Sequence, residues 1–219
     1  MDFDNETIRI AVNLYARNEK EGEEKYGHIN TWNVSNVTDM SQFFSGANTF
    51  NQPLNNWDVG NVTNMDSMFG CAASFNQPLN NWNVSNVTNM RGMFWSASSF
   101  NQPLDNWDVS NVIDMFYMFG FAKIFNKPLN TWNVSKVTDM LGMFNSTTIG
   151  EMLKKHNLTN ENYFDKKVYH ELFVWPRKKD YVTFLVNNQY LPLNKHQEEH
   201  EYHPLFDIPD ISKYITCYL

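Results

Sequence analysis

The sequence predicts an α/β repeat fold. This would be a solenoid in which every coil has one short parallel strand and one short helix, with a helical N-terminal cap and a mixed C-terminal cap. The first observation is repetition: the phrase FNQPLNNWDVGNVTNM at residues 50–65 returns at 75–90, 100–115 and, more loosely, 125–140. Self-similarity at roughly 20 to 50 residues is typical of solenoids. The second is patterning, because each copy passes from an alternating segment to apolar residues at helical spacing.

The repeat keeps a fixed register. Two aromatic positions recur every 25 residues and are occupied by Phe50, Phe75, Phe100 and Phe125, and by Trp57, Trp82, Trp107 and Trp132. A fifth copy upstream keeps the same phase at Trp32 and has Ile29 where later copies have Leu. Downstream the phase fails, because Gly150 and Asn157 stand where the next Phe and Trp would be. We therefore expect five coils over residues 29–148.

The first half of each copy predicts the strand. Leu54, Trp57, Val59 and Val62 form the pattern L-x-x-W-x-V-x-x-V, which approximates the L-x-x-L-x-L rhythm of leucine-rich repeats. Because side chains alternate across a strand, Trp57 and Val59 are expected to face the core and the polar residues between them to face solvent. The predicted architecture is therefore a leucine-rich-repeat-like solenoid.

The second half of each copy predicts the helix. Met65, Met68 and Phe69 lie at helical spacing, Thr63 can cap such a helix and Gly70 can end it. A polar position also recurs at the turn between copies, where a ladder of asparagines is expected to satisfy buried backbone groups. Its members are Asn51, Asn76, Asn101 and Asn126.

The two ends of the chain predict caps, because a solenoid exposes apolar faces at both termini. In residues 1–28, Ile8, Val12 and Tyr15 fall on one helical stripe, which predicts a helical N-terminal cap. Residues 149–219 differ in composition from the repeats and are rich in aromatic residues. They are expected to form a C-terminal capping or accessory segment.

The repeat phrases resemble those of a known family. The segments Trp107–Val109, Asn133–Val137, Met118–Phe119 and Phe100–Leu104 are similar to the BspA-like surface-protein repeat, also called the mycoplasma lipoprotein-type repeat. The resemblance covers residues 29–148. It implies a leucine-rich-like solenoid with an adhesive or other binding role and no catalytic residues. Similar repeats occur in protists and large DNA viruses, and the AT-rich residue usage fits a large DNA virus by analogy.

Composition narrows the functional classes. The net charge is −7 and no basic stripe is evident, which argues against a nucleic-acid partner. Cys71 and Cys217 offer no disulfide framework and no paired metal ligands, and we expect no cofactor and no metal. One remote alternative is a zinc-dependent hydrolase, because His196, Glu199 and His200 match H-x-x-E-H.

Two surfaces are candidates for binding. The first is the outward side of the expected strands, which carries Asn33, Ser35, Asn56, Asp58, Asn81, Asn83, Asn106, Asp108, Asn133 and Ser135. The second is an aromatic patch on the expected helix side, formed by Trp95, Tyr117 and Phe121, which the repeat does not demand. An alternative role for these three residues is filling between coils. The sequence therefore predicts a non-catalytic protein-interaction scaffold with an unidentified protein partner, acting as a monomer or within a larger assembly. The alternative is a structural component of a virion or other assembly.

The N-terminal segment bears on location. MDFDNETIRI is acidic and polar, whereas a secretory signal needs a basic start and an apolar run, and no stretch approaches the roughly 20 apolar residues of a membrane span. We expect an intracellular protein without a membrane partner, located in the cytoplasm or, if viral, in the host cytoplasm or the virion.

Overall fold

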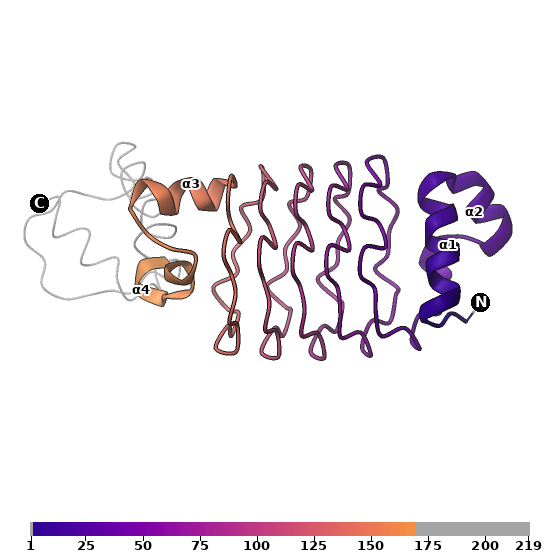
Figure 1. Cartoon of the computed structure of the whole chain (residues 1–219), viewed down its shortest axis with the longest axis horizontal. Coiled ribbons are helices and arrows are strands. Elements are labelled where there is room, and N and C mark those ends of the chain that lie inside the picture. The colour runs from indigo at the N-terminus through magenta and orange to yellow at the C-terminus, as the bar shows by residue number, and fades with distance from the viewer. Residues whose placement is uncertain (1, 170–219) are drawn as a thin grey trace, which may run out of the picture. The chain divides into compact units, whose positions relative to one another are not determined.

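The computed structural model describes residues 2–169. Along the chain, the elements are α1 (Asn5–Arg17), α2 (Glu19–Tyr26), the 3-10 turn η1 (Ile29–Thr31), α3 (Thr148–Lys155), the 3-10 turn η2 (Glu161–Phe164) and α4 (Lys166–Tyr169). The chain divides into two compact units, Met1–Lys166 and Lys167–Leu219, and the coils belong to the first. Between η1 and α3, this unit is a row of coils that lie side by side (Figure 1).

The α/β fold class predicted from the sequence is wrong for residues 2–169. No helix and no extended strand forms in the coils between η1 and α3, and strand pairing is reduced to isolated parallel bridges, one at each junction between coils. These bridges are Asp39–Asn64, Asn64–Asn89, Asn89–Asp114 and Asp114–Asp139. The coils are therefore built from turns, without the strand and helix per coil that a leucine-rich-like solenoid requires.

The segment predicted to be a helix is a chain of tight turns. The N–H groups of Met68 and Gly70 donate to carbonyls three residues earlier, those of Met65 and Ser67, at 3.2 and 3.0 Å. The N–H groups between them, such as that of Phe69, donate instead to the next coil. An α-helix sends every N–H to the carbonyl four residues back, so this alternation excludes it. Left-handed backbone at Ser67 (φ 53°) also breaks the helical path.

The segment predicted to be a strand also lacks a ladder. The N–H of Trp57 donates to the Leu54 carbonyl at 3.0 Å, and the N–H of Gly60 donates to Oδ1 of Asp58 at 3.1 Å. Local turn bonds thus satisfy the groups that a neighbouring strand would have paired. The predicted alternation is nevertheless confirmed, because Trp57 and Val59 are 3% and 1% exposed while Asn56 and Asp58 lie at the surface.

Aromatic columns fill the interior of the stack. Within a coil, the rings of Phe69 and Phe75 stack at 4.0 Å, and Phe69 also stacks on Phe94 of the next coil at 5.6 Å. The tryptophans form a second column, in which Trp107 and Trp132 stack at 6.3 Å. Each buried indole N–H donates to a carbonyl of the preceding coil at 2.8–3.0 Å. Because no coil encloses its own aromatic residues, apolar burial favours stacking.

The predicted asparagine ladder is present, but the backbone N–H groups that it satisfies are exposed or half-buried and not fully buried as predicted. Oδ1 of Asn51 accepts the backbone N–H of Asn76 at 2.9 Å, Oδ1 of Asn76 accepts that of Asn101 at 3.0 Å, and Oδ1 of Asn101 accepts that of Asn126 at 3.1 Å. Each carboxamide therefore connects its coil to the next. An apolar residue at this position would leave the neighbouring N–H without its acceptor.

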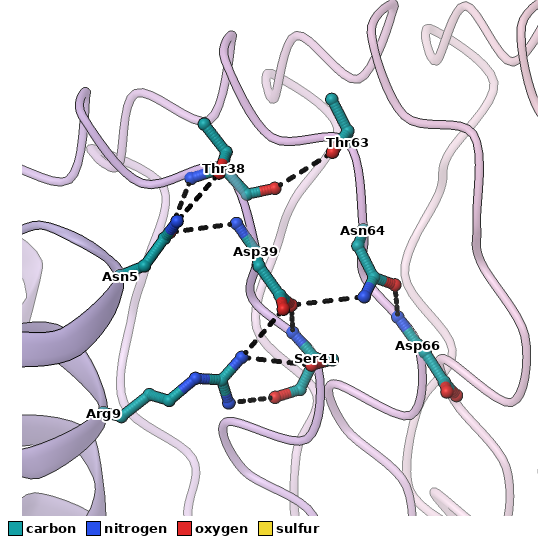
Figure 2. A network of polar contacts seen from close by, with 8 residues as sticks. All are labelled: Asn5, Arg9, Thr38, Asp39, Ser41, Thr63, Asn64 and Asp66. Atoms are coloured by element: carbon teal, nitrogen blue, oxygen red, sulfur yellow. Dashed lines mark hydrogen bonds and ion pairs between the residues drawn. The ribbon is translucent and has the colours of Figure 1, made fainter.

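Helix α1 closes the N-terminal end of the stack. Its predicted stripe is confirmed, because Ile8, Val12 and Tyr15 are at most 1% exposed. Oδ1 of Asn5 accepts the N–H groups of Thr38 and Asp39 at 2.9 and 3.1 Å (Figure 2). In the following coil, the same two N–H positions donate to a backbone carbonyl, that of Thr38. The Asn5 side chain therefore takes the place of a preceding coil.

Arg9 completes this cap (Figure 2). Its guanidinium donates to the carbonyl of Ser41 at 2.9 Å and to the Ser41 hydroxyl at 3.1 Å, and it forms an ion pair with Asp39 at 3.1 Å. In later coils, the carbonyl equivalent to that of Ser41 accepts a backbone N–H of the preceding coil, as Arg91 does from Ser67. Arg9 therefore supplies a donor that the first coil would otherwise lack.

Helix α3 and the turn η2 cover the apolar interior at the other end. Ile149 and Leu153 of α3 are 3% and 2% exposed, and the Tyr163 ring lies 5.0 Å from that of Phe144. The Tyr163 hydroxyl accepts the N–H of Leu129 at 3.2 Å. Met140, Met143 and Phe144 of the last coil are therefore buried.

Candidate functional site

Residues of the polar surface predicted from the alternating segment have a structural role, because they close local turns. Oδ1 of Asn83 accepts the backbone N–H and the hydroxyl of Ser85, two residues on, at 3.2 and 2.8 Å. The same contact to the N–H two residues ahead forms at every equivalent position, namely Asn33, Asp58, Asp108 and Asn133. Asn and Asp both provide this acceptor, which explains why the two residue types interchange there.

In Asp108, this contact also changes the pKa of the carboxyl group. The hydroxyl and the N–H of Ser110 donate to Asp108 and hold its pKa below the ordinary value, against a smaller opposing effect of burial. The charge of Asp108 is therefore coupled to the turn as well as exposed to solvent. This coupling weakens the case for Asp108 as a free recognition group.

The remaining members of the predicted polar surface differ. Asn56, Asn81 and Asn106 are exposed, and the backbone N–H groups of Asn56 and Asn106 donate to Asn30 and Asn80 at 3.0 and 3.1 Å. Ser35 is half-buried and Ser135 is exposed. Seven of the ten predicted residues therefore take part in local turns, because Ser35 and Ser135 donate their N–H groups to Asn33 and Asn133.

The predicted aromatic patch is partly assembled. The rings of Tyr117 and Phe121 stack at 6.2 Å, and Phe116 adds a third ring 4.7 Å from Tyr117. Trp95 belongs to the preceding coil and makes no ring contact with these residues within the part of the chain described here. Trp95 and Phe121 are 42% and 38% exposed. Tyr117 is half-buried.

Tyr117 also fills the junction with the next coil. A Cβ built on Gly142 would lie 2.6 Å from Cζ of Tyr117, so the ring covers that glycine. The alternative considered from the sequence, filling between coils, therefore holds for Tyr117. It does not account for the exposed faces of Trp95 and Phe121.

The backbone at this patch is unusual. Tyr117 and Phe121 have φ values of 51° and 62°, in the left-handed region. Equivalent positions in other coils share this conformation but carry smaller or flexible residues, as at Ser67 and Ser96. Bulky side chains are uncommon there, and such outliers concentrate at functional sites.

Arg91 contacts the ring cluster, and two further exposed apolar residues belong to the same coil as Tyr117 and Phe121. The guanidinium of Arg91 lies 3.9 Å from the centroid of the Phe116 ring and pairs with Asp114 at 3.9 Å. Ile113 and Ile124 are 48% and 49% exposed. The sequence carries a signal for Ile113, because all other copies have Thr at that position. Exposed apolar side chains that replace polar ones within a repeat are candidates for contact with a partner.

Neither a cluster of metal-ligating side chains nor a membrane-spanning helix is found in residues 2–169. Residues 2–169 contain no group of three or more His, Cys, Asp or Glu side chains arranged to hold a metal ion. His196, Glu199 and His200, the basis of the zinc alternative, lie outside the described residues. Among the helices of residues 2–169, none has the length and apolar character needed to cross a membrane.

Comparison with known proteins supports a family assignment. A family described as "Mycoplasma protein of unknown function, DUF285" matches residues 13–120 and 80–171, which together include all five coils. No curated protein and no solved structure matches the chain. The match agrees with the BspA-like, mycoplasma-type resemblance of the repeat phrases at the level of the family. The chain belongs to the DUF285 family of mycoplasma proteins of unknown function.

Proposed function

We propose that the chain is a non-catalytic protein-interaction scaffold and that it binds a protein partner through the aromatic patch of Trp95, Tyr117 and Phe121. One observation carries the proposal. Trp95 and Phe121 expose aromatic faces at positions where the stack is built equally well with serine, at Ser45 and Ser96. The fold does not require these aromatic residues, so another role is expected for them.

The left-handed backbone conformation of Phe121 supports the same conclusion, because it costs free energy. A left-handed conformation costs roughly 1–2 kcal/mol for a residue with a Cβ, and a bulky side chain adds crowding. Phe121 has this conformation, yet 38% of it stays exposed, so it recovers only part of the free energy that full burial would provide. Burial against a partner would recover the rest.

The chemistry of the patch suits a protein interface. Aromatic residues and Arg dominate the residues whose truncation costs most binding energy. Arg91 lies against Phe116, beside Tyr117, so its guanidinium adds a cationic group to the aromatic surface. The exposed carboxamides of Asn56, Asn81 and Asn106 offer hydrogen bonds but no large anchor, which fits a rim better than a centre.

The test uses serine substitutions that the repeat itself tolerates. The full chain and the double variant Trp95→Ser/Phe121→Ser are used as affinity baits in a lysate of the cells that encode the protein. Proteins that the wild type captures are then purified and titrated against both baits. Ile10→Ser is the matched control, because Ile10 is an exposed apolar residue (64%) on α1.

We expect the double variant to bind at least about tenfold more weakly, the loss typical of removing interface anchors. Ile10→Ser is expected to bind like the wild type. Equal binding by the wild type and the double variant, with unchanged unfolding midpoints, would exclude the patch as the binding surface.

A further inference from the structure

The last coil of the stack ends in an unpaired row of backbone donors. At each earlier junction, four N–H groups on alternate residues donate to carbonyls of the next coil; between the third and fourth coils these are Met90, Gly92, Phe94 and Ser96, at 2.8–2.9 Å. The equivalent residues of the last coil are Met140, Gly142, Phe144 and Ser146. Within residues 2–169, the N–H groups of these four residues have no acceptor.

This row borders a cleft. A cavity of about 830 Å³ is lined by Tyr117 of the preceding coil, by residues of the last coil between Thr138 and Ser146, by α3 and by residues 157–161. Leu141 stands at its edge and is 67% exposed. The cleft therefore combines backbone donors at two-residue spacing with an apolar contact.

The apolar interior of the last coil is already covered. Phe144 is fully buried, and Ile149 and Leu153 of α3 seal that side. A further complete coil would have to displace α3. A single extended ribbon of backbone would not, because it needs to reach only Gly142 and Ser146, which are half-buried, whereas Met140 and Phe144 are 6% and 0% exposed.

The charges that line the cleft indicate which side chains a bound ribbon would carry. Its lining includes Asp139, Glu151 and Glu161 but only one cation, Lys154. Oδ1 of Asp139 already accepts the N–H of Leu141 at 2.9 Å, whereas Glu151 and Glu161 are exposed. The cleft therefore favours cationic side chains by charge complementarity.

We propose that this edge binds an extended segment of a partner protein that carries Lys or Arg side chains, and that the segment adds to the stack as one more parallel ribbon. Carbonyls of the segment accept from Gly142 and Ser146, as the carbonyls of each following coil do from the equivalent residues at the earlier junctions. Open backbone edges recruit extended peptides in the same way. Tyr117 belongs to both the aromatic patch and the cleft lining, but the backbone donors and the charges that define this site do not include it, so the proposal does not depend on the aromatic patch.

The test measures amide exchange at single residues in the full-length, isotope-labelled protein. The probe is the blocked peptide acetyl-(Lys-Val)4-amide, and acetyl-(Glu-Val)4-amide is its charge-reversed control. Gly92 and Ser96 are internal references, because their N–H groups donate to Phe116 and Gly120 at 2.8 Å. A second comparison uses Glu151→Gln/Glu161→Gln against the control Glu23→Gln/Glu24→Gln on α2.

In the free protein, Gly142 and Ser146 are expected to exchange far faster than Gly92 and Ser96. The lysine peptide is expected to slow them at least about tenfold, as new hydrogen bonds do, and to leave the reference residues unchanged. The Glu151→Gln/Glu161→Gln variant should bind the lysine peptide about fivefold more weakly at low salt. The effect is modest because surface charges are screened by solvent and salt. The Glu23→Gln/Glu24→Gln control should bind the peptide as the wild type does.

Three results would overturn the proposal. If Gly142 is as protected as Gly92 in the free protein at every concentration, another part of the same chain covers the edge. If that protection rises with protein concentration, a second copy covers it. If the glutamate peptide protects Gly142 as well as the lysine peptide does, or if neither peptide protects it, the cleft does not recognise cationic extended segments.

Discussion

Oδ1 of Asn5 accepts the backbone N–H of Thr38 at 2.9 Å, in the position that a carbonyl of a preceding coil would otherwise occupy. The same oxygen also accepts the N–H of Asp39 at 3.1 Å. One carboxamide on α1 thus ends the repeated pattern of hydrogen bonds without exposing the first coil.

This relationship gives the first prediction. Asn5→Ala leaves the exposed N–H of Thr38 and the partly buried N–H of Asp39 without their acceptor and should lower the free energy of unfolding by about 1–3 kcal/mol. Asn5→Asp keeps the acceptor, loses only the donor to the Thr38 hydroxyl, and places a favourable charge at the start of a helix. Urea denaturation should therefore rank Asn5→Asp close to wild type. Equal losses in the two variants would show that the acceptor is unimportant.

The second prediction concerns the tryptophan column. Trp82→Ala removes a ring that is 4% exposed and should cost about 3–5 kcal/mol. Trp82→Phe keeps most of the apolar volume but loses the bond from the indole N–H to the Leu54 carbonyl, so about 1–2 kcal/mol is expected. Asn81→Ala, on the exposed side of the same coil, should change the midpoint little. A loss for Asn81→Ala as large as that for Trp82→Ala would contradict the inward and outward assignment.

The third prediction separates backbone strain from crowding. Gly27 and Gly142 have φ values of 73° and 67°, but a Cβ on Gly27 meets nothing within 4 Å, whereas one on Gly142 meets the Tyr117 ring. Gly27→Ala should therefore cost about 1–3 kcal/mol from backbone strain alone, because its φ of 73° and ψ of 178° lie in a region that essentially only glycine adopts. Gly142→Ala should cost about 1–3 kcal/mol more because of overpacking.

A double variant controls this comparison. Combining Gly142→Ala with Tyr117→Ser, the residue found at the equivalent Ser67, removes the ring that the new methyl group would meet. The interaction between the two substitutions in a thermodynamic cycle should be favourable. Strict additivity would mean that the ring does not cover Gly142.

The fourth prediction is a pH dependence at the N-terminal cap. Burial raises the pKa of Asp39, but hydrogen bonds from the N–H and hydroxyl of Ser41 and the nearby Arg9 guanidinium outweigh it, and the net pKa is lowered. A lowered pKa in the folded state contributes stability above the unfolded pKa of about 3.9, and this contribution is lost as the pH falls through the folded value.

Asp39→Asn isolates this contribution. Asparagine keeps the acceptor for Ser41, as Asn64 does for Asp66 in the next coil, but it loses the charge that faces Arg9. Because the Asp39 side chain is 40% exposed, the difference from wild type should be at most about 1 kcal/mol near neutral pH. Chemical denaturation at several pH values should show this difference shrinking below about pH 4. A difference that stays constant down to about pH 2 would contradict the ion pair.

The sequence predicts the repeat and its period, but it does not predict the path of the backbone within each coil. The period, the burial of Trp57 and Val59, and the ladder at Asn51 all follow from identical residues recurring in register. The helix was predicted wrongly because Met65, Met68 and Phe69 are spaced three and four residues apart, which successive turns produce as well as a helix does.

The candidate site could also be predicted only in part from the sequence. An exposed Asn or Asp in an alternating segment looks the same whether it binds a partner or closes a turn, so the bond from Asn83 to Ser85 could not be distinguished from a recognition surface. The roles of Asn5 and Arg9 depend on tertiary contact with coils more than 30 residues away. The aromatic patch could be predicted from the sequence, because Trp95 and Phe121 depart from an otherwise regular repeat.

The central claim is that each coil alternates its backbone donors between itself and the next coil, and scalar couplings across hydrogen bonds test it directly. In the deuterated, isotope-labelled protein, the amide nitrogen of Phe69 should couple to the carbonyl carbon of Met93, and that of Met68 to the carbonyl carbon of Met65. Coupling of the Phe69 nitrogen to the Met65 carbonyl, as in an α-helix, would contradict the account.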